Sequence, residues 1–192
     1  HVLATFAADI DFDGNATTDA TSAGGSDIAV VELDTSGTTV RFDTIGGSGF
    51  DQATGIQVDD FGNRYLVGSF EGTVDFDPTT AGTQEKTSAG GSFDVFVSQL
   101  GPTGGFGWVQ HFGSTLNDLG TDLSLAADGS LYVSGYFNGD VQFVSNSVQP
   151  SGIQSQAEDG FILHMSAVGD VQSVRTVGGI GDDRTNALAV GT

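Results

Sequence analysis

A long internal repeat constrains this chain more than any other feature of its sequence. The stretch from Thr87 to Gly113, TSAGGSFDVFVSQLGPTGGFGWVQHFG, recurs upstream from Thr21 to Gly46 and more faintly downstream from Gln156 to Gly178. Two sets of aspartates keep one period, with successive members 67 and then 65 positions apart: Asp51, Asp118 and Asp183, and Asp27, Asp94 and Asp159. A fixed period of this length is the signature of a repeat architecture.

Each repeat has the pattern of four short strands and none of the periodicity of a helix. Apolar residues alternate with small or polar ones in ATGIQVDD and GTDLSLAAD, as they do in a half-buried strand. The turns DFGN and ADGS follow, in which glycine supplies a positive φ, and a second strand comes next, RYLVGSF or LYVSGYF. The third and fourth strands are DVFVSQL and FGWVQHF in the middle repeat. The 30 glycines among 192 residues fit a chain with many tight turns.

Four antiparallel strands per repeat, at this repeat length, are typical of the blade of a β-propeller. We therefore predict an all-β fold made of four-stranded antiparallel blades, with three blades in this chain: residues 1–51, 52–118 and 119–183. A β-sandwich is the alternative, but it does not account for a recurrence at a fixed spacing. One blade cannot bury both of its faces, so blades are expected to pack face to face.

The two ends of the chain complement each other in this scheme. Residues 184–192 have the pattern of a first strand without a second, and His1–Phe6 has that of a second strand without a first, so together they would complete one blade. Propellers typically have 4 to 8 blades, so three are too few to close a ring. Closure is expected to need a second copy, giving six blades, or further repeats of a longer chain. The absence of an initiator methionine suggests that the amino terminus is processed, excised or engineered.

Composition narrows the classes of function. The 25 acidic residues outnumber the 5 basic ones, for a net charge of −20, which disfavours binding to nucleic acid or to an anionic membrane. There is no cysteine, so disulfides, thiolate metal sites and a cysteine nucleophile are excluded. No apolar run approaches the roughly 20 residues that a membrane-spanning helix needs.

The middle repeat resembles the SBBP repeats, a family of bacterial β-propeller repeats. The likeness lies in GTVDFDPTTAGTQEKTSAGGSFDVFVSQL, in GIQVDDFGNRYLVGSF before it and in GFGWVQHFGS after it. It covers almost the whole chain in three copies and is weakest in the third, where VQFVSNSVQP replaces VDFDP. The resemblance implies a propeller fold and an extracellular or cell-surface setting in bacteria. It assigns no catalytic residue.

One segment has the pattern of a cation-binding loop. Asp9, Asp11 and Asp13 alternate before Gly14 in DIDFDGNATTD, and carboxylate oxygens in such a loop can bind Ca²⁺. An EF-hand is excluded, because no helices are predicted on either side and Ala20 stands where a bidentate glutamate is required. The alternative is that these acids are solvated residues where a strand meets a loop.

The remaining candidate residues favour structural roles. The recurring aspartates are expected to accept hydrogen bonds from turn amides, because a catalytic residue is needed once and a structural one in every repeat. His111 and His164 lack the close spacing of a zinc pair, and no G-x-S-x-G motif is present. Trp108 is expected to pack between repeats, although a sugar-stacking platform is the alternative.

From these features we predict a non-enzymatic structural or interaction module that assembles through contacts between blades. Its expected partner is a second copy of itself or neighbouring repeats, with no nucleic acid and no membrane insertion. The alternative is a glycan- or protein-binding propeller of a bacterial surface protein, stabilised by calcium. No cofactor other than Ca²⁺ is expected.

Overall fold

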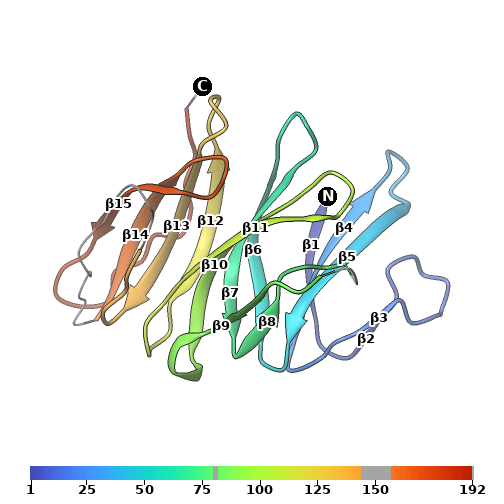
Figure 1. Ribbon diagram of the computed structural model, residues 1–192, viewed down its shortest axis with the longest axis horizontal. Coiled ribbons are helices and arrows are strands. Elements are labelled where there is room, and N and C mark those ends of the chain that lie inside the picture. Colours follow the sequence, from blue (N-terminus) through green and yellow to red (C-terminus); the bar gives the residue numbers. More distant parts are fainter. Residues whose placement is uncertain (80–81, 144–156, 192) are drawn as a thin grey trace.

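A computed structural model describes residues 1–79, 82–143 and 157–191 of the chain, and its regular structure is almost entirely β. Four antiparallel sheets are present, together with one short 3-10 helix, η1 (Ala89–Gly91). Figure 1 shows the three larger sheets side by side in sequence order along the molecule. The predicted all-β antiparallel architecture is confirmed, and the sheets of the described residues do not close on one another. No helix in these residues has the length and hydropathy to span a membrane.

The second and third sheets are four-stranded meanders in which neighbours in sequence are also neighbours in space. The second sheet contains β6 (Asp51–Val58), β7 (Arg64–Glu71), β10 (Phe93–Leu100) and β11 (Phe106–Phe112). The third contains β12 (Leu119–Leu125), β13 (Leu131–Asn138), β14 (Glu158–Met165) and β15 (Val171–Val177). Each of these sheets therefore consists of the four strands of one sequence repeat.

The first sheet is built differently, because it has five strands drawn from two repeats. Its order is β1 (Val2–Phe6), β4 (Asp27–Leu33), β5 (Thr39–Gly47), β8 (Thr73–Asp75) and β9 (Glu85–Thr87). The β8–β9 hairpin comes from the connection between β7 and β10 and reaches back to pair with the end of β5. In the first repeat, the corresponding connection forms the separate hairpin of β2 (Asp9–Ile10) and β3 (Ala20–Thr21).

Glycine in the second strand of a repeat allows neighbouring chains to approach closely. A Cβ at Gly68 would lie 2.0 Å from the carbonyl oxygen of Gln52, and a Cβ at Gly135 would lie 2.2 Å from that of Leu119. The equivalent glycines of two repeats thus face the same obstacle, a backbone oxygen of the first strand. Glycine inside a strand is typical of such a close approach of two backbones.

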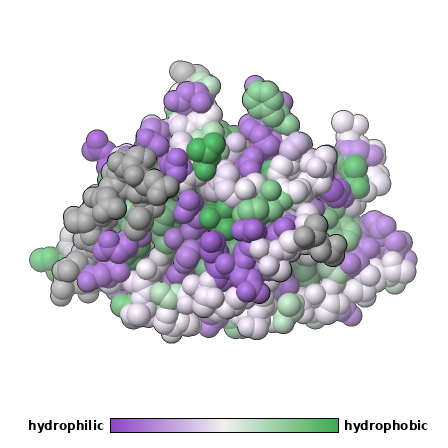
Figure 2. All heavy atoms as spheres, viewed as in Figure 1, coloured by the Kyte–Doolittle hydropathy of each residue, from purple (hydrophilic) through white to green (hydrophobic). Residues whose placement is uncertain are grey.

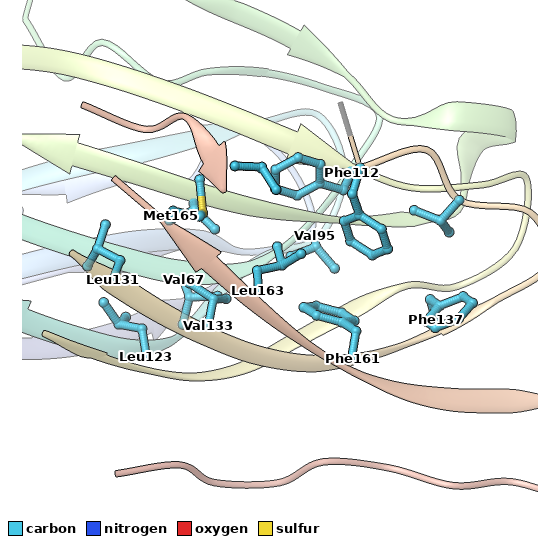
Figure 3. Close-up of a cluster of buried hydrophobic side chains, with 14 of the residues drawn as sticks. Val67, Val95, Phe112, Leu123, Leu131, Val133, Phe137, Phe161, Leu163 and Met165 are labelled. Carbon is cyan, nitrogen blue, oxygen red and sulfur yellow. The ribbon is translucent and has the colours of Figure 1, made fainter. Parts of the chain in front are cut away.

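Two clusters of apolar side chains fill the spaces between the sheets. One lies between the second and third sheets and includes Val67, Val95, Leu123, Val133 and Phe161 (Figure 3). The other lies between the first and second sheets and includes Ile28, Val30, Phe70 and Phe96. The middle sheet contributes to both clusters, because side chains alternate between its two faces. A sheet with two apolar faces is stable only between neighbours, and the row supplies one on each side.

Candidate functional site at the sheet junctions

A backbone hydrogen bond from a recurring aspartate closes each junction, which we define as the place where the chain leaves one sheet to begin the next. The three bonds run from Asp51 N to Ser26 O (2.8 Å), from Asp118 N to Phe93 O (2.8 Å) and from Asp183 N to Glu158 O (2.6 Å). Every acceptor lies at the start of the third strand of the preceding repeat or one residue before it. The third junction therefore keeps the geometry of the other two, although no further sheet follows it in the described residues.

A threonine hydroxyl forms a second link at two of these junctions. Thr54 Oγ1 donates to the carbonyl of Gly120 at 2.9 Å, and Thr121 Oγ1 donates to that of Thr185 at 2.7 Å. The two donors lie 67 positions apart, and in each case the acceptor lies two residues after the aspartate of the next junction. Residue 185 therefore lies against the third sheet as Gly120 lies against the second.

A third link uses different side chains to reach the same point. Arg41 Nη1 donates to the carbonyl of Pro102 at 3.1 Å, and Trp108 Nε1 donates to that of Ala167 at 3.2 Å. Both donors lie in the fourth strand of their repeat, and both acceptors lie in the turn before the fourth strand of the next repeat. Trp108 also contacts the core cluster between the second and third sheets, so its observed role is packing between repeats.

The buried aspartates that begin the second and third sheets hold the junctions from inside. Each accepts one backbone N–H from the end of the preceding fourth strand or from the loop after it, and one from the end of the second strand of its own sheet. Asp51 accepts from Gly47 (2.8 Å) and Glu71 (3.3 Å), and Asp118 accepts from Ser114 (2.6 Å) and Asn138 (2.8 Å). The predicted binding of backbone amides by these two aspartates is confirmed.

The other set of recurring aspartates faces a glycine at the end of the fourth strand. If that glycine carried a Cβ, the atom would lie within about 2 Å of the carboxylate in all three repeats. The pairs, with the nearest distance, are Gly46 and Asp27 (2.2 Å), Gly113 and Asp94 (2.1 Å), and Gly178 and Asp159 (1.9 Å). These three glycines have the same 67- and 65-residue spacing, a signal present in the sequence but concealed among 30 glycines.

Burial perturbs the protonation of these carboxyl groups. Asp94 is 1% exposed; its Oδ2 accepts the N–H of Ala89, whereas its Oδ1 is buried without a hydrogen-bond partner. Desolvation, with the negative charge of Asp118 adding to it, raises the pKa of Asp94 to about 7. Burial likewise raises the pKa of Asp51 and of Asp118 to about 6. These carboxyl groups therefore take up protons near neutral pH. They are surrounded by backbone atoms and packed side chains.

A buried ion pair joins the first sheet to the second. Arg64, at the start of β7, is fully buried; its Nη1 lies 2.5 Å from Asp43 Oδ2, and its Nη2 donates to the carbonyl of Gly101 at 3.1 Å. Arg41 Nε lies 3.6 Å from the same carboxylate oxygen. Sequence reasoning missed this pair, because a single arginine before an apolar strand carries no pattern that separates a buried base from an exposed one.

The segment from Asp183 to Gly191 has no strand partner in the described chain, yet hydrogen bonds hold it against the third sheet. Thr185 Oγ1 donates to the carbonyl of Phe161 at 3.0 Å, and Leu188 N donates to Asp122 Oδ2 at 3.0 Å. It is not a β-strand, because no neighbouring strand of the described residues pairs with it through a ladder of backbone hydrogen bonds. At the other end of the row of sheets, β1 pairs with β4 along one of its edges, and no strand of the described residues pairs with its other edge.

The predicted calcium ligands are only partly brought together. Within the described residues, the one group of acids that could share a metal ion is Asp11, Asp13 and Asp19, whose ligand oxygens lie within 4.8 Å of one another. Asp9 lies outside this group, because it belongs to β2 and accepts the Thr21 hydroxyl at 2.6 Å. Asp11 also accepts the backbone N–H groups of residues 13, 14 and 16. Asp19 ends the loop that the sequence singled out but is not among the three predicted ligands, and calcium binding stays a prediction.

The two strand histidines lie in separate aromatic contacts. His111 faces Phe70 with ring centroids 5.9 Å apart, and burial lowers its pKa. His164 stacks on Tyr132 at 4.6 Å with nearly parallel rings. Neither histidine joins a group of metal-ligating side chains within the described residues.

Comparison with known proteins gives one distant similarity. No family model matches the chain. The chain is 27% identical over 131 residues to a protein described as Regulatory protein FlaEY, from Caulobacter vibrioides. The matched region is 68% of this chain but only 13% of that protein's length. The likeness concerns a small part of a much longer protein.

Proposed function

We propose that this chain is a non-enzymatic structural module, a segment of a β-propeller that assembles through contacts between blades. The blades are residues 1–51, 52–118 and 119–183, and residues 184–192 begin a further or ring-closing blade. The observation that carries the proposal is the hydrogen bond from Thr121 to Thr185, which repeats the bond from Thr54 to Gly120. The terminal segment is therefore held where the first strand of a next blade belongs.

The segment that best fits the free edge of β1 is the carboxyl-terminal segment of a second copy of the chain. β1 is the second strand of its repeat and has a free outer edge among the described residues, whereas residues 184–191 have the place of a first strand and no ladder partner. Such contact is head to tail, and two copies would supply six blades, within the usual range for a closed ring. The neighbouring repeats of a longer chain would meet the same requirement.

Two copies that each carry a charge of −20 repel one another at low ionic strength. Association should therefore strengthen as salt is added, opposite to the behaviour of partners of opposite charge. An extracellular or cell-surface setting and membership of the SBBP repeats belong to the same proposal, supported by the strand and turn motifs of the sequence.

Sedimentation equilibrium at several salt concentrations tests the assembly. We expect a species of twice the 19.6 kDa of one chain, with a larger share at higher salt. Leu188→Asp should abolish it, because a carboxylate would replace an apolar side chain in the proposed first strand. Val168→Asp, in an exposed turn, is the matched control and should leave the mass unchanged. A wild-type chain that stays a monomer at every salt concentration would refute the proposal.

A further inference from the structure

An open groove lies between two equivalent hairpin turns, the β6–β7 turn (residues 59–63) and the β12–β13 turn (residues 126–130). Its volume is about 610 Å³, and its lining includes Tyr65, Leu125 and Ala167. The two hairpin tips project from the same edge of the molecule in Figure 1, and Figure 2 shows a notch between them. A cavity of several hundred Å³ is the usual size of a ligand site.

Internal hydrogen bonds fix the walls of this groove before anything binds. Asp59 Oδ1 accepts the backbone N–H groups of Phe61 and Asn63 at 2.9 and 2.8 Å. Asp128 Oδ1 accepts the N–H and the hydroxyl of Ser130 at 3.0 and 2.7 Å. Little ordering is therefore needed on binding, which lowers the cost of association.

One wall carries an aromatic ring that the turn itself does not require. Phe61 is 83% exposed, and Asp128 lies at the equivalent position of the next repeat, where it supports a similar turn with a polar side chain. Val58, also exposed, lines the groove beside Phe61. A single exposed apolar residue is ordinary, but two that line the same groove offer a contact surface.

The charge of the groove selects the kind of ligand. Its lining contains Asp59, Asp60 and Asp128, and none of the lining residues is a lysine, an arginine or a histidine. Hydrogen bonds from Ser130 hold the pKa of Asp128 below its usual value, so this carboxylate is ionised at neutral pH. An anionic ligand is repelled here, whereas a cationic one is attracted.

We infer that this groove binds a basic segment of a partner polypeptide. The aliphatic stem of a lysine or arginine side chain lies across Phe61 and Val58, and its charged end points to the carboxylates of Asp60 and Asp128. Arginine suits the site best, because its guanidinium group can contact an aromatic face and donate hydrogen bonds to a carboxylate together.

Isothermal titration calorimetry of the full chain with a capped tetra-arginine peptide tests this inference, with a capped tetra-glutamine peptide as the neutral probe. We expect the arginine peptide alone to bind. Phe61→Ser should weaken binding by about two- to fivefold, the usual worth of an exposed cation–π contact. Asp60→Asn should weaken it by a similar factor of about two to five. Glu85→Gln removes the same charge from an exposed position on β9 and is the matched control.

The variants separate a defined site from general attraction to an acidic protein. If Phe61→Ser and Asp60→Asn each weaken binding more than Glu85→Gln does, the groove is the site. If all three weaken it equally, the peptide binds diffusely to the negative surface and the inference is wrong. Absence of binding by the arginine peptide, or equal binding of the glutamine peptide, also overturns it. Circular dichroism of each variant checks that the fold is retained.

Discussion

Lowering the pH from 8 to 5 should stabilise this protein, the reverse of ordinary acid denaturation. Burial raises the pKa of Asp94 to about 7 and that of Asp51 and Asp118 to about 6, from 3.8. Between these values and 3.8 the folded state binds more protons than the unfolded chain. The free energy of unfolding therefore rises as the pH falls through 7 and 6 towards 4, and falls as the pH rises.

The magnitude follows from the size of the shifts. One pKa unit corresponds to about 1.4 kcal/mol, so Asp94 alone should add about 2 to 3 kcal/mol to the free energy of unfolding between pH 8 and pH 5. Asp51 and Asp118 should each add about 1 kcal/mol over the same interval. Exposed acids with a lowered pKa, such as Asp11 and Asp34, act in the opposite sense only below about pH 4, outside this window. His111 opposes the aspartates inside it, because burial lowers its pKa from 6.5 and the unfolded chain then binds a proton that the folded state does not, but one histidine offsets only part of the gain from three carboxyl groups.

Urea unfolding followed by circular dichroism at pH 8, 7, 6 and 5 measures the effect. Asp94→Asn keeps the shape of the side chain but cannot ionise, so the unfolding free energy of this variant should vary less with pH by about 2 kcal/mol or more. Glu85→Gln controls for the loss of one charge and should retain the wild-type slope. A wild-type stability that falls steadily from pH 8 to pH 5, or an Asp94→Asn variant with the wild-type slope, would refute the reasoning.

Three further predictions concern single contacts. Gly113→Ala should destabilise the protein by about 2 kcal/mol in urea unfolding, because its Cβ meets a buried carboxylate, whereas Gly105→Ala, with nothing within 4 Å of the new atom, should be nearly neutral; equal effects would contradict this. Arg64→Met should cost about 3 kcal/mol by leaving Asp43 without its closest partner, and an unchanged urea midpoint would show that the pair is dispensable. Calcium should raise the thermal midpoint of the wild type but not of Asp11→Asn, and a midpoint insensitive to both calcium and chelator would exclude the site.

Strand positions were predictable because they depend on short-range pattern. The second strand of the middle repeat was predicted from Arg64 to Phe70 and runs from Arg64 to Glu71 in the structure. Alternation over a few residues, together with a turn of the DFGN type, is sufficient to locate such a strand. The aspartate period then indicated which strands belong to one sheet, and the second and third sheets follow it.

Contacts between repeats were harder to predict, because they depend on which loop reaches which neighbour. The VDFDP stretch is not among the four strands that the pattern predicts for the middle repeat, yet Val74 and Phe76 are fully buried and β8 extends the first sheet. Asp19 was not among the three predicted ligands, although it ends the same loop; it lies eight residues after Asp11, and only the folding of that loop brings the two together. Neither the repeat period nor the composition indicates which loop folds back onto which neighbour.

The junctions repeat a geometry more faithfully than they repeat side chains. Arg41 and Trp108 differ in size and charge, yet each donates a hydrogen bond to the turn before the fourth strand of the next sheet. Where the backbone itself is the contact, the donor is an aspartate at all three junctions, but the acceptors differ in type: Ser26, Phe93 and Glu158. In the proposed assembly, a new sheet begins where an aspartate N–H reaches the preceding third strand and a carbonyl two residues later accepts a threonine hydroxyl. Residues 183 to 185 make both contacts, which supports the proposal that they begin a further blade.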